Sequence, residues 1–188
     1  MYLDNILPFA RKLLSCRLSA GCRALDGTAG NGHDTLLLAE LVGASGKVLA
    51  FDVQEAALFQ TASRLAQAGV AARVTLIHDS HEKLTDYVDE PLDAAVFNFG
   101  WLPGGDKSCT TEAQSSVNAL NAVLPLLKPN GLLLAVLYPG HEVGRREAQA
   151  VENWAENLPQ QEFSVLKYGF TNRRNAPPYL LAVEKLTA

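Results

Sequence analysis

Short β-type runs alternate with helical patterns along almost the whole sequence, and this alternation restricts the fold more than any other feature. Strands that alternate with helices predict a mainly parallel sheet with helices on both faces, an α/β fold. The last two runs are joined by a loop without a helical pattern, which predicts a terminal hairpin with an antiparallel last strand. The expected strands cover residues 22–26, 47–52, 74–78, 92–98, 132–138, 163–170 and 179–184.

The length and composition favour one globular unit. A chain of 188 residues with 48% hydrophobic and 19% charged residues can bury one core, so we expect residues 1–188 to form a single domain. No apolar run reaches the roughly 20 residues that cross a bilayer, which predicts a cytoplasmic protein without a membrane partner. Three cysteines without a CxxC pair predict neither a disulfide framework nor a metal site.

Ligands of open parallel sheets bind beyond the carboxyl ends of the strands. After the first strand stands LDGTAGNGHDT, in which Gly30 and Gly32 allow close approach of the backbone and a helix begins near His33 or Asp34. A dinucleotide fingerprint requires a third glycine where Thr35 stands, and no GK[ST] phosphate loop is present. This loop therefore argues against an NAD-dependent oxidoreductase. The sequence also lacks the Tyr-x-x-x-Lys pair that such an enzyme would need.

Carboxylates follow three successive strands, at Asp26, Asp52 and Asp79. An acid at the end of the second strand is suited to the hydroxyls of a ribose, and one after the third strand can accept a hydrogen bond from an adenine amino group. Each carboxylate alone is explained as a helix cap. Three of them beside a glycine loop favour an adenosine site.

The segments DGTAGNGHDT, FDVQ, HDSH, NFGWLPGGDK, YPGH and NAPP resemble the "putative rRNA methylase" family of class I S-adenosylmethionine-dependent methyltransferases. The resemblance extends over residues 7–185. It implies a Rossmann-like seven-stranded, mostly parallel sheet and S-adenosylmethionine as cofactor. Members of this family methylate 5-aminomethyl-2-thiouridine at the wobble position of tRNA, so the resemblance implies the anticodon region of tRNA as partner.

The resemblance also implies a set of cofactor-binding residues. The loop after the first strand would face the methionine end, Asp52 and Gln54 the ribose, and the segment after the third strand the adenine. Thr28 stands where the superfamily usually has its first glycine. The full set is Asp26, Gly30, Asn31, Gly32, His33, Asp34, Thr35, Asp52, Gln54, Asp79, Ser80 and His81.

The segment NFGW at 98–101 has the end spacing of the Asn/Asp-Pro-Pro-aromatic motif of amino-group methyltransferases. We expect Asn98 to hold the target amine and Trp101 to stack on the base. An alkyl amine must lose a proton before attack, and Asp106 and His141 are the candidate acceptors. The alternatives are core packing for Trp101, a cap for Asp106 and a structural hydrogen bond for His141.

A net charge of −4 argues against a surface that is basic throughout, so RNA would bind through a limited patch, which a homodimer would enlarge. Cys109 is expected to be a packed thiol and not a nucleophile. Three alternatives stay open: a methyltransferase acting on a small molecule, one acting on rRNA, and a nucleotide-binding module without catalysis. The residues that would contact phosphates are Lys107, Arg145, Arg146, Arg173 and Arg174.

Overall fold

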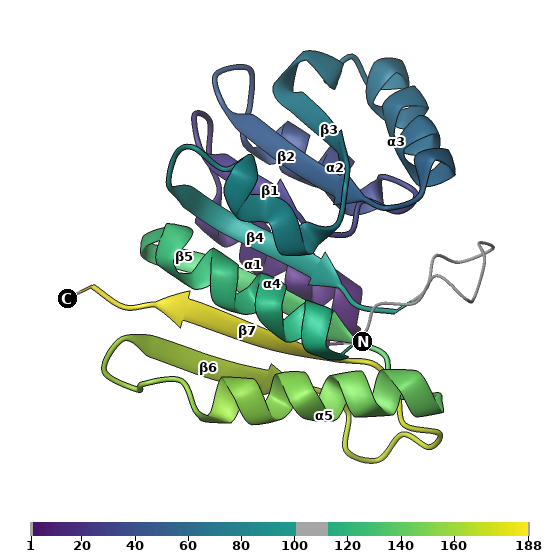
Figure 1. Ribbon diagram of the computed structural model, residues 1–188, viewed down its shortest axis with the longest axis vertical. Helices are drawn as coiled ribbons and strands as arrows, with labels where there is room; N and C mark the ends of the chain where they lie inside the picture. The colour runs from purple at the N-terminus through teal and green to yellow at the C-terminus, as the bar shows by residue number, and fades with distance from the viewer. Residues whose placement is uncertain (1, 101–112, 188) are drawn as a thin grey trace.

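The computed structural model describes residues 2–100 and 113–187. Seven strands form one sheet in the order β3-β2-β1-β4-β5-β7-β6 (Figure 1). Neighbours from β3 to β5 are parallel, whereas β7 runs antiparallel to both β5 and β6. The predicted α/β fold and its antiparallel last strand are confirmed. The strands are β1 (Arg23–Asp26), β2 (Lys47–Asp52), β3 (Val74–His78), β4 (Leu92–Asn98), β5 (Leu127–Leu137), β6 (Phe163–Tyr168) and β7 (Tyr179–Lys185).

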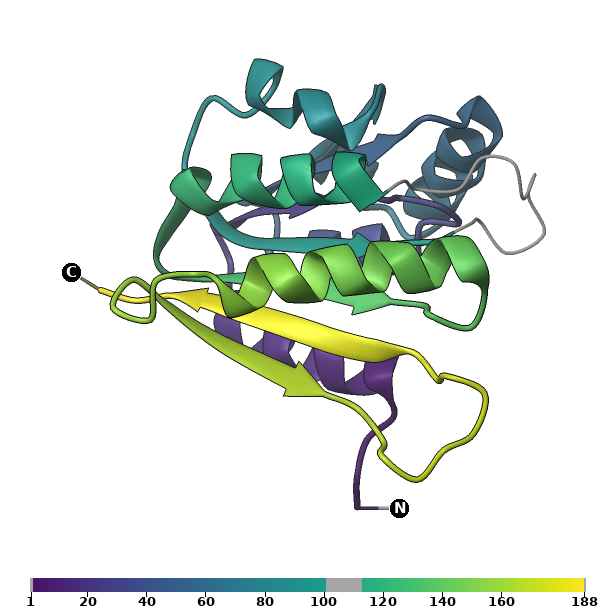
Figure 2. The same cartoon turned by 60° about the horizontal axis from the view of Figure 1, so that its bottom comes forward.

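Helices cover both faces of the sheet, as the alternation predicts. One face carries α1 (Ile6–Arg17), α2 (His33–Leu41) and α3 (Glu55–Gln67). The other carries the 3₁₀ helix η2 (His81–Asp86), α4 (Ala113–Leu126) and α5 (Glu142–Glu156). Figure 2 shows α1 on the opposite side of the sheet from α4 and α5. A short 3₁₀ turn, η1 (Ala71–Arg73), precedes β3.

Strand β4 lies at the centre of the sheet and explains why the core has two halves. Successive side chains of a strand point to opposite faces. Val96 therefore packs with Leu14 of α1 and Leu38 of α2, whereas Phe97 packs with Leu120 of α4. The side chains on both faces of β4 are therefore buried, which is typical of a strand that helices cover on both sides.

Helix α1 was not among the predicted segments. Its buried residues Ile6, Ala10 and Leu14 are spaced by four, so the helical period is present in the sequence. The helix packs against β4, β5 and β7. It thereby brings an N-terminal segment to the carboxyl ends of the central strands.

Two strands end earlier than the sequence predicts, and β7 explains both differences. Its first residue, Tyr179, pairs with Leu137 of β5, and its second, Leu180, pairs with Tyr168 of β6. The residues before Tyr179 are two prolines, which have no N–H group to extend a ladder. Tyr138 and Phe170 therefore fall outside the strands that the sequence assigns them to.

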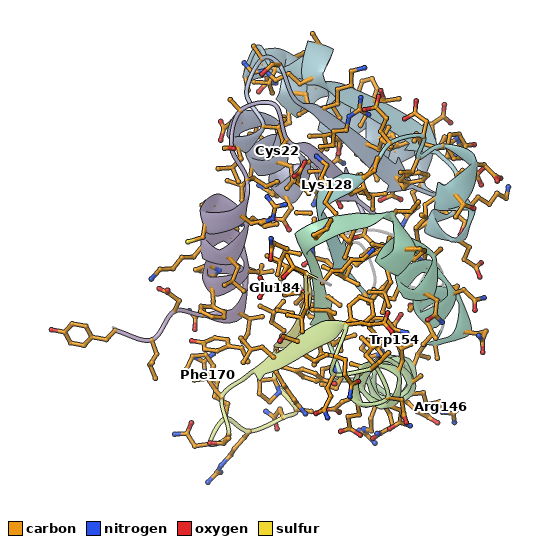
Figure 3. All side chains as sticks on the ribbon, turned by 90° about the vertical axis from the view of Figure 1, so that its left-hand side faces the viewer. Cys22, Lys128, Arg146, Trp154, Phe170 and Glu184 are labelled. Atoms are coloured by element: carbon orange, nitrogen blue, oxygen red, sulfur yellow. The ribbon has the colours of Figure 1, made fainter. Side chains whose placement is uncertain are left out.

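Basic residues at the amino ends of the parallel strands neutralise a buried acid. Asp93 accepts hydrogen bonds from Arg17 at 3.1 Å and Lys128 at 2.7 Å, and from the backbone N–H of Arg23 at 2.8 Å. Figure 3 shows Lys128 at the same end of the sheet as Cys22. These cations are thus occupied far from the carboxyl ends of the strands.

The predicted turn at residues 128–131 lies within the bounds of β5. Asn130 has a left-handed backbone there, with φ of 61°. The register with β4 shifts across this point, because Leu92 pairs with Leu127 and Ala94 pairs with Leu132. The turn therefore takes the form of a bulge in the strand. The helix cap predicted at Thr111 lies outside the described residues.

Candidate functional site

A cavity of about 850 Å³ opens at the carboxyl ends of the parallel strands. Its walls are the glycine loop after β1, the segments that follow β2 to β5, helix α1 and the loop between β6 and β7. This is the position expected for ligands of an open parallel sheet, and the volume is within the range of small-molecule sites.

The glycines of the loop after β1 meet different requirements. Gly30 and Gly32 have left-handed backbones with φ of 52° and 75°. A Cβ atom on Gly32 would lie 2.8 Å from the Thr61 hydroxyl oxygen, and one on Gly27 would lie 2.0 Å from the Phe97 ring. Close packing inside the protein therefore fixes Gly27 and Gly32, whereas Gly30 lines the cavity.

Asp52 ties the glycine loop to the end of β2. Its carboxylate accepts hydrogen bonds from the backbone N–H of Gly30 at 2.8 Å and of Gln54 at 2.9 Å. Each carboxylate oxygen still has a second lone pair, and the side chain lines the cavity. The arrangement leaves Asp52 able to accept the two hydroxyl groups of a ribose.

Asp26, for which the sequence predicted a ligand contact, is fully buried and is not among the residues that line the cavity. Its carboxylate accepts hydrogen bonds from the Thr28 backbone N–H at 3.0 Å and from the Thr35 hydroxyl at 2.6 Å. Burial raises the pKa of Asp26 to about 7. Asp26, Gly32 and Thr35 lie behind the cavity wall, where the hydrogen bonds of Asp26 brace the turn between β1 and α2.

The segment after β3 lines the cavity with residues that are already partly engaged. Asp79 forms an ion pair with Lys83 at 2.9 Å and accepts a hydrogen bond from the Tyr87 hydroxyl at 2.9 Å. The Lys83 ammonium holds the pKa of the Asp79 carboxyl below its usual range. Ser80 caps η2 by accepting from the Glu82 backbone N–H. An adenine would thus meet an acid that internal contacts orient.

His81 is buried between the glycine loop and the aromatic core. Its Nδ1 lies 3.2 Å from the Gly27 carbonyl oxygen, so Nδ1 must carry the proton that it donates. Its ring contacts Phe97 and Phe99 edge-on. Burial lowers the pKa of His81, which keeps the ring neutral and leaves Nε2 as a hydrogen-bond acceptor that has no partner among residues 2–100 and 113–187.

Arg64 of α3 supports the far side of the glycine loop. Its Nε donates to the Asn31 carbonyl oxygen at 2.8 Å, and its terminal nitrogen lies 3.3 Å from His33 Nε2. Asn31 and His33 both line the cavity. The loop is therefore held from two neighbouring elements, β2 and α3.

Asn98 ends β4 with its side chain at the cavity. Its backbone N–H donates to the Thr28 hydroxyl at 2.7 Å, and its side-chain nitrogen donates to Asp34 at 2.9 Å. Asp34 also binds Arg11 of α1 at 3.0 Å. The sequence predicted Asn98 and Asp34 at the site, whereas it gave Arg11 no role there. Trp101, Asp106, Lys107 and Cys109 lie outside the described residues.

His141 is the N-cap of α5. Its Nδ1 accepts a hydrogen bond from the Gly144 backbone N–H at 3.0 Å, so the neutral ring carries its proton on Nε2. A Cβ atom on Gly144 would lie 2.7 Å from the imidazole. His141 also lines the cavity, and this contact favours the structural role over the predicted role as proton acceptor.

The loop between β6 and β7 closes one side of the cavity with Asn175, Ala176 and the two prolines that follow. Asn175 and Ala176 both have left-handed backbones, with φ of 64° and 45°. Such conformations are strained for residues other than glycine and persist where the surroundings impose them.

A family model described as "Putative rRNA methylase" matches residues 48–184. The chain belongs to this family. A similar protein is the chloroplastic tRNA (mnm(5)s(2)U34)-methyltransferase of Arabidopsis thaliana, which is 36% identical over 85% of this chain. The chain spans 62% of the length of that relative.

Two solved structures have nearly the same fold as this rRNA methylase family member. A "putative rRNA-methylase" from Clostridium thermocellum is 35% identical, with a TM-score of 0.97 over 99% of this chain and 100% of the other. A "putative methyltransferase" from Streptococcus mutans, solved in complex with SAH, is 37% identical, with a TM-score of 0.90 over 98% and 99%.

Metal-ligating clusters and membrane-spanning helices are both absent from the described part of the chain. No group of three or more metal-ligating side chains occurs in residues 2–100 and 113–187. Across the same residues, no helix is long and apolar enough to cross a membrane.

Proposed function

We propose that this chain is an S-adenosylmethionine-dependent N-methyltransferase that methylates the aminomethyl group of 5-aminomethyl-2-thiouridine at the tRNA wobble position. Family membership supports the reaction class, and SAH in the Streptococcus mutans structure supports the cofactor. The Arabidopsis relative, named for this nucleoside, supports the acceptor.

The cavity walls fit the cofactor. We assign Asp52 and Gln54 to the ribose, and Asp79, Ser80 and His81 to the adenine. We assign Asn31 and His33, which also line the cavity, to the methionine end. The bound cofactor would supply an electrophilic methyl group on a sulfonium.

The observation that carries the proposal is the orientation of the Asn98 amide. Asn98 Nδ2 donates to Asp34, so the amide oxygen is left to accept a hydrogen bond in the cavity. An amine held by this oxygen can direct its lone pair at the methyl carbon, and positioning of this kind accounts for a large share of a rate enhancement. The new nitrogen–carbon bond forms as the carbon–sulfur bond breaks and its electron pair returns to sulfur.

The amine must reach the site without its proton. His141 Nδ1 is occupied by Gly144, so His141 is not our choice of proton acceptor. We assign the proton to water at the cavity opening, with Asp106 as the side-chain alternative outside the described residues.

The loop between β6 and β7 supports an RNA substrate. It carries exposed Arg173 and Arg174 directly before the residues that line the cavity. Arg173 stacks over the Phe170 ring, 3.6 Å from its centre, and donates to Asn5 at 2.8 Å. Phosphates of a stem-loop whose flipped base enters the cavity would pass this edge, where guanidinium groups are strong phosphate ligands.

The proposal is tested by incubating the protein with labelled S-adenosylmethionine and tRNA that carries unmethylated 5-aminomethyl-2-thiouridine, followed by nucleoside mass spectrometry. We expect one added methyl group on that nucleoside. Parallel reactions with rRNA fragments and with small amines cover the alternative acceptors. Labelling of either, without labelling of tRNA, would contradict the proposed substrate.

A further inference from the structure

The two oxygens of Asp34 are bound by different elements. Oδ1 accepts from the Arg11 guanidinium of α1 at 3.0 Å, and Oδ2 accepts from the Asn98 amide nitrogen at the end of β4 at 2.9 Å. The Asp34 side chain is only 15% exposed. A continuous chain of charge-assisted hydrogen bonds therefore joins α1 to the residue assigned to the target amine.

Asp34 fixes which end of the Asn98 amide faces the substrate. A flipped amide would place its oxygen against the Asp34 carboxylate and lose the hydrogen bond, so the network selects one orientation. In that orientation no donor among residues 2–100 and 113–187 binds Asn98 Oδ1. Among the described residues this oxygen therefore has no donor, and we assign it to the amine that enters the cavity.

Arg11 changes the electrostatics of the same point. An unpaired carboxylate beside an alkyl amine would stabilise the ammonium form, which has no lone pair for attack. The Arg11 guanidinium neutralises Asp34 from the side away from Asn98. The pair can therefore hold the amide without favouring protonation of the amine.

Other charged or titratable groups lie near the Arg11–Asp34–Asn98 network and affect how turnover depends on pH. Tyr138, directly after β5, and the buried Asp26 both interact electrostatically with Asp34. Burial raises the pKa of Tyr138, so its hydroxyl stays neutral. Asp52, His33 and His141 line the same cavity.

We propose that Arg11 and Asp34 are positioning residues for methyl transfer, acting through Asn98 and not on the cofactor. This inference rests on the proposed N-methyltransferase function. It moves Asp34 from the methionine end of the cofactor, where the family resemblance placed it, to the acceptor side. It also gives α1 a role in turnover.

A double-mutant cycle tests the role of Asp34. We expect Asp34→Asn to lower kcat about tenfold in the wild-type background and less than about twofold in Asn98→Ala, because residues that act as a unit are not additive. Calorimetry should show cofactor affinity within about twofold of wild type. Multiplicative losses of kcat, or an equal loss of cofactor affinity, would overturn the proposal. Circular dichroism and thermal unfolding establish that each variant is folded.

The role of Arg11 has a separate readout in the pH profile of kcat. Arg11→Gln should move the acidic limb of the profile upward by about half a pH unit or more, since an unneutralised carboxylate favours the ammonium. Arg11→Lys should restore most of the wild-type profile. Lys12→Gln is the matched control, because Lys12 is 69% exposed and its ion-pair partner, Asp4, does not belong to the Arg11–Asp34–Asn98 network.

These outcomes separate the two proposals. If wild-type protein transfers no methyl group to 5-aminomethyl-2-thiouridine in tRNA, the proposed function fails. If the wild type is active but Arg11→Gln leaves the pH profile unchanged and the Asp34 effect persists in Asn98→Ala, the inference alone fails.

Discussion

The Asn98 side-chain nitrogen lies 2.9 Å from Asp34 Oδ2, and this contact decides which atom of the amide faces the cavity. Asp52, on the other side of the glycine loop, accepts two backbone N–H groups and has lone pairs left for a ribose. The two side chains therefore present acceptors to different ligands in one cavity.

Substitution of these two residues should separate turnover from cofactor binding. Asn98→Ala should lower kcat by about 100-fold and leave cofactor affinity nearly unchanged, because only the amine loses its acceptor. Asp52→Ala should weaken cofactor affinity by about tenfold or more, through lost hydrogen bonds and a loosened loop. Calorimetry and initial rates measure the two quantities. Equal effects of each variant on both quantities would contradict this division of roles.

His141 should be replaceable by another capping residue. Asn is among the preferred N-caps, so His141→Asn should keep both turnover and stability near wild type. His141→Ala should lose roughly 1 kcal/mol of unfolding free energy, because the Gly144 N–H loses its acceptor. Kinetics and denaturant unfolding of both variants are the measurements. A large loss of turnover in His141→Asn would instead support a proton-transfer role.

Asp26 should make the stability depend on pH. Burial raises its pKa from 3.8 to about 7, so between these values the folded protein holds a proton that the unfolded chain releases. The unfolding free energy attributable to Asp26 therefore falls as pH rises from about 4 to 7 and is constant above. Asp26→Asn keeps an acceptor for the Thr28 N–H and should flatten this fall. Thermal unfolding of the wild type and Asp26→Asn across that pH range measures this effect. An identical slope of stability against pH in both proteins would rule out the contribution of Asp26.

Arg174 should affect RNA binding and not chemistry. Arg174→Ala should raise KM for tRNA and reduce the slope of log affinity against log salt by about one, with little change in kcat. Arg146→Ala is the matched control: the sequence also suggested Arg146 as a phosphate contact, but Arg146 lies on α5, where it is 76% exposed and pairs with Glu142. Figure 3 shows Phe170, the ring under the neighbouring Arg173, on the other side of the molecule from Arg146. Equal effects of the two variants would show that only total charge matters.

The sheet could be predicted from the sequence because its signals are local. Apolar runs and the helices between them set the order of the elements, and the missing helix after β6 marks the hairpin. The ends of β5 and β6 could not be predicted from their own residues, because Pro177 and Pro178 of a distant segment end both ladders. Helix α1 carries the same kind of local signal, in the spacing of Ile6, Ala10 and Leu14.

The site could be placed from the sequence but the roles within it could not. Polar residues after β1 to β4 correctly indicated the carboxyl ends of the strands as the site. The cavity there is lined by Gly30, Asp34, Asp52 and Asn98, among others. Asp26 follows a strand just as Asp52 does, yet the packing of Thr35 against it determines that it is buried. A side chain's partners come from elements that sequence spacing does not reveal.

The position of β7 has a consequence for how this protein acquires its site during synthesis. Strand β7 pairs with β5 through residues 132–137 and 179–184, although it is made more than 40 residues later. Until it emerges from the ribosome, β5 is an unpaired edge and the loop at 175–178 has no anchor. The cavity wall is therefore completed last, and a nascent chain paused before β7 would leave the backbone N–H and C=O groups on one side of β5 unpaired and open to pairing with another chain.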